Sequence, residues 1–194
     1  MIKKIFLIAC MSGIFLPVLG QYEEQALTVL DQMSENYKNL DSFKADFSYS
    51  LENKMEDIQE EFSGDIIVKG DKFKLNLGDQ VIFNDGEIMW TEVTRSMRQR
   101  WGLGENSDSG LANFLSGVRG SKVVIVFTER DDGIIDVGMR SVPGYDVATV
   151  ALKLGGGGHP QAAGCTLGGD MPAVQARVLE EVKQSLAATR LEEP

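Results

Sequence analysis

The chain has 194 residues, of which 43% are hydrophobic and 25% are charged, a balance typical of folded globular proteins. Its formal net charge of -10 excludes a protein that coats nucleic acid by bulk attraction, because phosphates repel such a surface unless positive charge is locally concentrated. The single histidine, His159, and the two cysteines exclude a metal site built from a cluster of His and Cys ligands. Because of the negative net charge, any anion-binding site must depend on positive groups concentrated at one place on the surface.

Residues 1–20, MIKKIFLIACMSGIFLPVLG, have the pattern of a secretory signal peptide. Two lysines precede an apolar run that is too short to span a bilayer comfortably, and Val18 and Gly20 occupy the small-residue positions of a cleavage site. A retained membrane anchor is the weaker alternative, because Pro17 interrupts the run. Lipidation at Cys10 is a second alternative. The pattern predicts a periplasmic or secreted protein with no transmembrane segment after cleavage.

The basic residues change identity near position 95. Residues 1–94 contain eight lysines and no arginine, whereas residues 95–194 contain eight arginines and three lysines. Folding does not require such a change, because solvated Lys and Arg are largely interchangeable on a surface. The pattern favours a composite chain, natural or artificial, over ordinary heterogeneity between domains. We therefore predict a signal peptide over residues 1–20, one domain over residues 21–93 and a second over residues 94–194.

The front half reads as a helix followed by an antiparallel sheet. Apolar residues at three- and four-residue steps predict an amphipathic helix over residues 23–40. Apolar and polar residues then alternate over residues 43–51, which predicts a strand with one solvent-exposed face and one buried face. Further strands are predicted at residues 61–69, 72–77, 81–84 and 87–92. The turns between them contain Gly-Asp and Asp-Gly pairs, which are typical of hairpins.

The order of these elements, with the segments LDSFKADFSYS, FSGDIIVKGDKFKL and NDGEIMW, resembles the N-terminal half of the LolA family of periplasmic lipoprotein carriers over about residues 1–92. In that family a curled antiparallel sheet shelters lipoprotein acyl chains in an apolar cavity. The resemblance implies cavity residues at Phe43, Phe47, Phe62, Ile66, Val68, Phe73, Leu75 and Trp90. Ordinary core packing is the alternative for each of them.

The LolA-like sheet stops early in this sequence. In the family it continues well past the hairpin that ends in NDGEIMW, whereas here the pattern ends at Glu92. A partial half-barrel of this kind leaves an unpaired strand edge and an uncovered apolar face. We expect both features in residues 21–93.

After residue 95 the sequence alternates between short helices and strands joined by Gly-rich turns. A helix is predicted over residues 110–118 and strands over residues 122–127 and 134–139. A second helix is predicted over residues 144–154, and a last helix begins near Asp170 and Pro172. The predicted fold class is α+β: an N-terminal helix on a partial antiparallel half-barrel sheet, followed by a small α/β domain.

Between the last two helices lies LGGGGHPQAAGCTL. Four consecutive glycines allow backbone N–H groups to approach an anion closely, although a glycine run alone is also typical of a flexible linker. The string GGGGHPQAAG, with MRS at residues 139–141 and GLANFL at residues 110–115, resembles the DHH-associated C-terminal domain of DHH phosphoesterases. That family includes RecJ-like exonucleases and NrnA-like oligoribonucleases, and the resemblance covers about residues 95–188. It implies a C-terminal half typical of cytoplasmic proteins, which conflicts with the predicted signal peptide.

In that family the domain holds a nucleotide or short RNA against a separate catalytic domain. The resemblance implies substrate contacts from Arg140, Ser141, Gly156, Gly157, Gly158 and His159. A guanidinium can hold a phosphate through two parallel hydrogen bonds, and an imidazole can donate one more. The alternatives are a surface ion pair for Arg140 and a structural imidazole for His159.

Hydrolysis in the DHH family depends on two metal ions, Mn or Mg, held by a domain that contains an Asp-His-His motif. A chain with one histidine cannot supply that motif, and two-metal catalysis needs such a ligand cluster. We therefore expect no catalytic residues, no metal site and no cofactor bound by this chain alone. The expected partner is a nucleotide or the end of a short RNA or DNA. The alternative is a periplasmic carrier that binds lipoprotein acyl chains.

Overall fold

The computed structural model describes residues 24–38, 40–53, 58–104 and 110–192. The chain divides into two compact units, residues 1–40 and residues 41–194. The first unit contains helix α1 (Glu24–Lys38), which confirms the predicted N-terminal helix. The signal peptide predicted for residues 1–20 lies outside the described residues.

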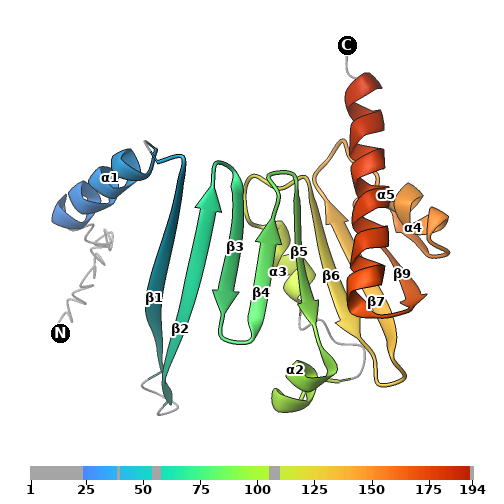
Figure 1. Ribbon diagram of the computed structural model, residues 1–194, viewed down its shortest axis with the longest axis horizontal. Coiled ribbons are helices and arrows are strands. Elements are labelled where there is room, and N and C mark those ends of the chain that lie inside the picture. The colour runs from blue at the N-terminus through green and yellow to red at the C-terminus, as the bar shows by residue number, and fades with distance from the viewer. Residues whose placement is uncertain (1–23, 39, 54–57, 105–109, 193–194) are drawn as a thin grey trace, which may run out of the picture. The chain divides into compact units, whose positions relative to one another are not determined.

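The described part of the second unit is built on one nine-stranded sheet, in the order β1-β2-β3-β4-β5-β6-β7-β9-β8 (Figure 1). The front strands are β1 (Ser42–Asn53), β2 (Ile58–Lys69), β3 (Lys72–Leu77), β4 (Gln80–Asn84) and β5 (Ile88–Val93). The remaining strands are β6 (Val123–Glu129), β7 (Ile134–Ser141), β8 (Gly157–His159) and β9 (Ala162–Gly168). The helices of this unit are α2 (Arg95–Arg100), α3 (Leu111–Ser116), α4 (Val147–Lys153) and α5 (Met171–Glu192). The predicted α+β class is confirmed.

The sheet continues across the predicted domain boundary. β5 pairs with β6 in parallel, from Ile88 opposite Val123 to Val93 opposite Thr128. The expected unpaired edge at Glu92 is therefore wrong. A parallel pair needs a long crossover connection, and residues 94–122, which contain α2 and α3, supply it. Because residues Val123 to Phe127 of β6 are buried on both faces, these five residues form an uninterrupted apolar run.

Helices cover both faces of the C-terminal part of the sheet. α4 and α5 pack on one face, and α3 packs on the other, over β6 and β7. Figure 1 shows α4 and α5 together beside the C-terminal strands. The first face carries the larger core, which includes Ile88 from the front half together with Ile125, Phe127, Val137, Met139, Val150, Val178 and Val182. One core therefore contains residues from both sides of position 94.

Polar contacts also join the two halves of the sequence. The Nε2 of Gln175 in α5 donates to Oε2 of Glu92 at 2.8 Å. Glu87 pairs with Lys122 at 2.8 Å and with Arg190. The hydrogen bond that Lys122 donates lowers the pKa of Glu87, and the one from Arg190 lowers it further. The bond between Lys122 and Glu87 also raises the pKa of Lys122. The change from lysine to arginine in the sequence does not coincide with a break in the fold.

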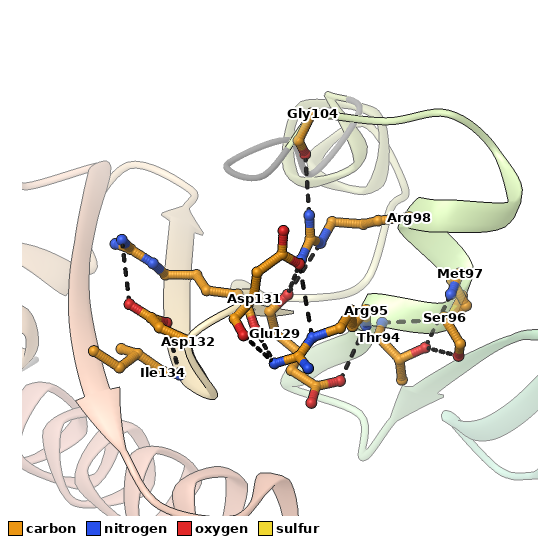
Figure 2. A network of polar contacts seen from close by, with 11 residues as sticks. Thr94, Arg95, Ser96, Met97, Arg98, Gly104, Glu129, Asp131, Asp132 and Ile134 are labelled. Carbon is orange, nitrogen blue, oxygen red and sulfur yellow. Dashed lines mark hydrogen bonds and ion pairs between the residues drawn. The ribbon is translucent and has the colours of Figure 1, made fainter.

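The short helix α2, which the sequence patterns did not predict, is fixed by arginines (Figure 2). The Arg98 side chain is only 3% exposed. Its Nε and Nη2 donate to the backbone oxygen of Glu129 at 3.0 and 2.7 Å, and Nη2 also meets Oδ1 of Asp131 at 2.8 Å. Arg95 donates to the backbone oxygen of Arg130 at 3.0 Å. These bonds hold the crossover connection against the turn between β6 and β7.

Candidate functional site

The register of β7, β9 and β8 brings Arg140 and His159 onto one face of the sheet. Arg140 lies opposite Ala162, and Ala162 lies opposite His159. Directly opposite residues of antiparallel strands point to the same face. A strand spacing of about 4.8 Å places the Cα atoms of Arg140 and His159 roughly 10 Å apart. Only the methyl group of Ala162 stands between them, so both long side chains can reach one anion held above it.

The guanidinium of Arg140 is oriented but not neutralised. Its Nε donates to Oδ1 of Asn113 in α3 at 3.1 Å, and Nη1 donates to the backbone oxygen of Met139 at 3.0 Å. Among the residues that the structure describes, Arg140 forms no ion pair with a carboxylate. This arrangement disfavours the surface ion pair that the sequence left open. His159 is exposed, so its imidazole is accessible to a ligand.

The next row on this face consists of glycines. Gly138 lies opposite Gly164, and Gly164 lies opposite Gly157. A Cβ at Gly157 would meet no heavy atom within 4 Å, and a Cβ at Gly138 would come no closer than 3.9 Å to the backbone oxygen of Val126. Neither position has a positive φ. The fold does not require glycine at these two positions, and their missing side chains leave the floor of the site open.

Gly156 and Gly158 have a different role. A Cβ at Gly156 would lie 2.1 Å from the backbone oxygen of Gly164, and a Cβ at Gly158 would lie 2.5 Å from that of Ala162. Gly158 also has a φ of 146°, which L side chains rarely adopt. These two glycines allow β8 to approach β9. The glycine run is therefore an edge hairpin rather than a flexible linker.

Ser141 is not brought together with Arg140 and His159. It follows Arg140 directly in β7, so its side chain points to the opposite face. Its hydroxyl donates to the backbone oxygen of Tyr145 at 2.6 Å and lies 3.2 Å from that of Pro160. Ser141 thus holds the segment before α4 against the turn between β8 and β9, and it supports the site from behind.

A third row closes the far end of the site with polar side chains. Thr128 lies opposite Asp136, and Asp136 lies opposite Thr166. The hydroxyl of Thr166 donates to Oδ1 of Asp136 at 3.0 Å, and Arg130 lies 3.8 Å from the same oxygen. This row lines a hollow of about 500 Å³ together with four glycines, Gly138, Gly155, Gly156 and Gly164. The Arg140 row continues the same face of the sheet beyond the lining of this hollow. We call the strip of sheet from the Asp136 row to the Arg140 row, with the hollow at its Asp136 end, the groove.

The sequence analysis missed Asn113, Asp136 and Gly138 as site residues. Two of them carried a usable signal, because D-x-G-x-R over residues 136–140 places Asp136, Gly138 and Arg140 on one face of a strand. Asn113 lies within the GLANFL segment of the resemblance, but nothing in the sequence indicated its contact with Arg140, which depends on how α3 packs on the sheet.

The proposed lipid-cavity residues divide between the two faces of the front strands. By register, Phe43, Phe47, Phe62, Ile66, Val68, Phe73 and Leu75 share the face on which α3 lies. Trp90 points to the opposite face, where it stacks on Phe83 with ring centroids 5.3 Å apart and packs against the larger core.

A second hollow, of about 710 Å³, opens on the α3 face beside α2 and α3. Of the eight predicted cavity residues, Phe62 lines it. The other apolar residues of its wall come from both halves of the sequence: Tyr49, Leu77, Val93, Met97, Trp101, Leu103, Leu111 and Phe114. This mixture could not be predicted from the front half alone.

Among the described residues, no three His, Cys, Asp or Glu side chains lie close enough together to hold a metal ion. Cys165 is buried in the larger core, and burial raises the pKa of its thiol, which favours the protonated, unreactive form. Within the described ranges, no helix is both long and apolar enough to cross a bilayer.

Comparison with known proteins supports the predicted resemblance of the C-terminal half. Residues 99–188 match the family model of the DHHA1 domain. A curated relative, the bifunctional oligoribonuclease and PAP phosphatase NrnA of Thermus thermophilus, is 38% identical over 107 residues. That alignment covers 55% of this chain and 32% of the relative, so the chain spans about a third of the relative's length. The family match does not include residues 21–93, whose resemblance to the LolA family stays a prediction.

Two solved structures are similar at low sequence identity. An exopolyphosphatase-related protein from Bacteroides fragilis aligns with a TM-score of 0.47 and 18% identity, covering 58% of this chain and 32% of that one. The pGpG-specific phosphodiesterase PggH from Vibrio cholerae aligns with a TM-score of 0.40 and 13% identity, covering 54% and 36%. These TM-scores are too low to bear on fold or function.

Proposed function

We propose that the C-terminal half binds a nucleotide or the end of a short single-stranded nucleic acid in the groove, with the phosphate between Arg140 and His159. The observation that carries this proposal is the shared face of Arg140, His159 and the open glycines Gly138 and Gly157. The DHHA1 match over residues 99–188 and the oligoribonuclease named in the curated relative support it.

The physical argument rests on local charge. The chain as a whole carries a net charge of -10, so a phosphate is attracted only where a cation is not already neutralised. Arg140 is such a cation among the described residues, and Asn113 holds its Nε in place. A fixed guanidinium loses less side-chain entropy when it binds a phosphate than a mobile one does. The glycine row then lets the ligand approach the backbone of the sheet.

The proposal assigns binding rather than hydrolysis to this chain. The groove offers an arginine, a histidine and glycines as ligand contacts, and one histidine cannot supply the Asp-His-His motif of the DHH catalytic domain. We expect this chain alone to show no phosphoesterase turnover. Metal-dependent release of mononucleotides from short RNA by the purified protein would contradict this part of the proposal.

Replacing Arg140 with alanine should weaken binding of a short 5′-phosphorylated RNA by roughly 10- to 100-fold, because a charge-assisted hydrogen bond contributes about 1.5–3 kcal/mol. Fluorescence anisotropy with a labelled oligonucleotide measures this change. Arg177→Ala, which removes an exposed arginine from α5 on the other face, is the matched control and should leave the affinity within about 2-fold. Equal losses in both variants would show non-specific attraction and would contradict the proposed site.

A second candidate function, the binding of acyl chains, is favoured by the 710 Å³ apolar hollow beside α2 and α3. A volume of this size suits a small apolar ligand. In this case Phe62→Glu should abolish stoichiometric uptake of a lipid-like fluorescent probe, because it puts a charge into the wall. Ile67→Glu, at an exposed position on the opposite face of the same strand, should leave uptake unchanged. Failure of the unmodified protein to take up the probe would exclude this function.

A further inference from the structure

We infer that the far end of the groove recognises the base of the bound nucleotide, with the carboxylate of Asp136 accepting a hydrogen bond from an exocyclic amino group. This inference rests on the proposed phosphate site at Arg140. It adds a direction to the ligand and a preference among bases.

The spacing along β7 fits a nucleotide laid along the strand. Arg140 and Asp136 point to the same face and are four residues apart, with Gly138 between them. At about 3.3 Å per residue their Cα atoms are roughly 13 Å apart. A bare phosphate held at Arg140 cannot reach Asp136, whereas a nucleoside attached to that phosphate extends over the glycine row towards it. The sugar follows the phosphate directly, so it lies above the glycines, and the base edge reaches the far end.

The Asp136 side chain is prepared for a donor. Thr166 and Arg130 both approach Oδ1, at 3.0 and 3.8 Å. Neither of these two contacts involves the second carboxylate oxygen of Asp136, Oδ2. The side chain is 31% exposed, so a ligand in the groove can reach it. Two neighbours thus fix the direction of the carboxylate and leave acceptor capacity on its second oxygen.

The two ends of the groove set the orientation of the ligand. A carboxylate repels a phosphate and accepts hydrogen bonds without donating any, so the phosphate belongs at Arg140 and a donor belongs at Asp136. Cytosine presents an amino group at position 4, which carboxylates accept, whereas the matching position of uracil is a carbonyl oxygen. The two rings are otherwise closely similar in shape. The groove should therefore prefer cytosine over uracil, and amino-bearing bases generally.

Isothermal titration of the full chain with 5′-CMP and 5′-UMP tests this inference. We expect the unmodified protein to bind CMP roughly 10- to 100-fold more tightly than UMP, because CMP gains one hydrogen bond to a charged group. Asp136→Asn should reduce the ratio to within about 2-fold, because the amide offers both a donor and an acceptor. Thr166 can still donate to the amide oxygen, so this variant should keep its fold. Asp170→Asn, an exposed change just before α5, is the control and should leave the ratio unchanged.

The possible outcomes test base recognition by Asp136 separately from phosphate binding at Arg140. One outcome is that the unmodified protein binds CMP and UMP with equal affinity and that Arg140→Ala loses binding of both. This result would overturn the role of Asp136 but would support the phosphate site. If neither nucleotide nor ribose 5-phosphate binds in a way that depends on Arg140, the phosphate site itself fails, and the inference fails with it. A CMP preference that persists in Asp136→Asn would assign base recognition to other residues and would also overturn the inference.

Discussion

Replacing Gly156 with alanine is expected to lower the free energy of unfolding by about 3 kcal/mol or more, whereas the same replacement at Gly157 should change it by less than about 1 kcal/mol. A Cβ at Gly156 would lie 2.1 Å from the backbone oxygen of Gly164 and 2.6 Å from Cys165. Both neighbours belong to β9, a strand of the central sheet, so neither can move cheaply. A Cβ at Gly157 would meet no heavy atom within 4 Å.

Thermal unfolding of the two variants measures this difference. In a protein of this size, 3 kcal/mol corresponds to a fall in Tm of roughly 6–12 °C. Gly157→Ala should unfold close to the unmodified protein but bind the 5′-phosphorylated RNA more weakly, because its methyl group enters the floor of the groove. Equal stability of both variants would contradict the edge hairpin formed by β8 and β9.

Replacing Arg98 with methionine is expected to lower the free energy of unfolding by about 2–3 kcal/mol. Methionine keeps the length of the side chain and a good helix propensity, so the loss comes from the polar contacts. Backbone oxygens of Glu129 and Gly104 lose their donor, and Asp131 loses its ion-pair partner. Asp131 is 57% exposed and can turn to water, which keeps the loss below the roughly 3–5 kcal/mol that follows when one partner of a fully buried ion pair is removed.

Arg100→Met is the matched control, since Arg100 lies in the same helix but is 63% exposed. Its pair with Asp79 should contribute less than about 1 kcal/mol. Chemical denaturation of both variants gives the comparison. A loss in Arg98→Met no larger than that in Arg100→Met would mean that the buried arginine does not fix the crossover between β5 and β6.

Local periodicity was sufficient to predict most elements. Alternation of apolar and polar residues located the strands of the front half, and the turns Gly70-Asp71 and Asp85-Gly86 separated them at the observed positions. The apolar run at the start of β6 and the Asp131-Asp132-Gly133 turn located β6 and β7 in the same way. Strands and tight turns depend mainly on residues that are close together in the sequence, so their positions could be predicted from the sequence alone.

Pairing between distant segments was not predictable in the same way. The parallel register of β5 on β6 joins residues about 35 positions apart, from Ile88 opposite Val123 onward. It is fixed by packing and by Arg98, a residue that looks like any surface arginine in the sequence. Trp90 was placed on the cavity face for a related reason: the predicted sheet had no further strand, so the core on its other face was not foreseen.

The candidate site was predicted in part. The resemblance of residues 95–188 to a DHH-associated domain located Arg140, the glycines and His159 as one set. It could not separate Gly156 and Gly158, which the hairpin requires, from Gly157, which leaves space for a ligand. Nor could it show that Ser141 faces away from Arg140, because that depends on the strand alternation of β7 rather than on the motif.

An amide hydrogen-exchange map of the full chain, with and without a short 5′-phosphorylated oligonucleotide, tests the central claim most directly. The proposed groove predicts that protection rises in residues 138–141 and 155–166, with little change in residues 42–53 and 62–77. Unchanged exchange in the groove at saturating oligonucleotide, or a rise confined to the front strands, would contradict the assignment of nucleotide binding to the C-terminal half.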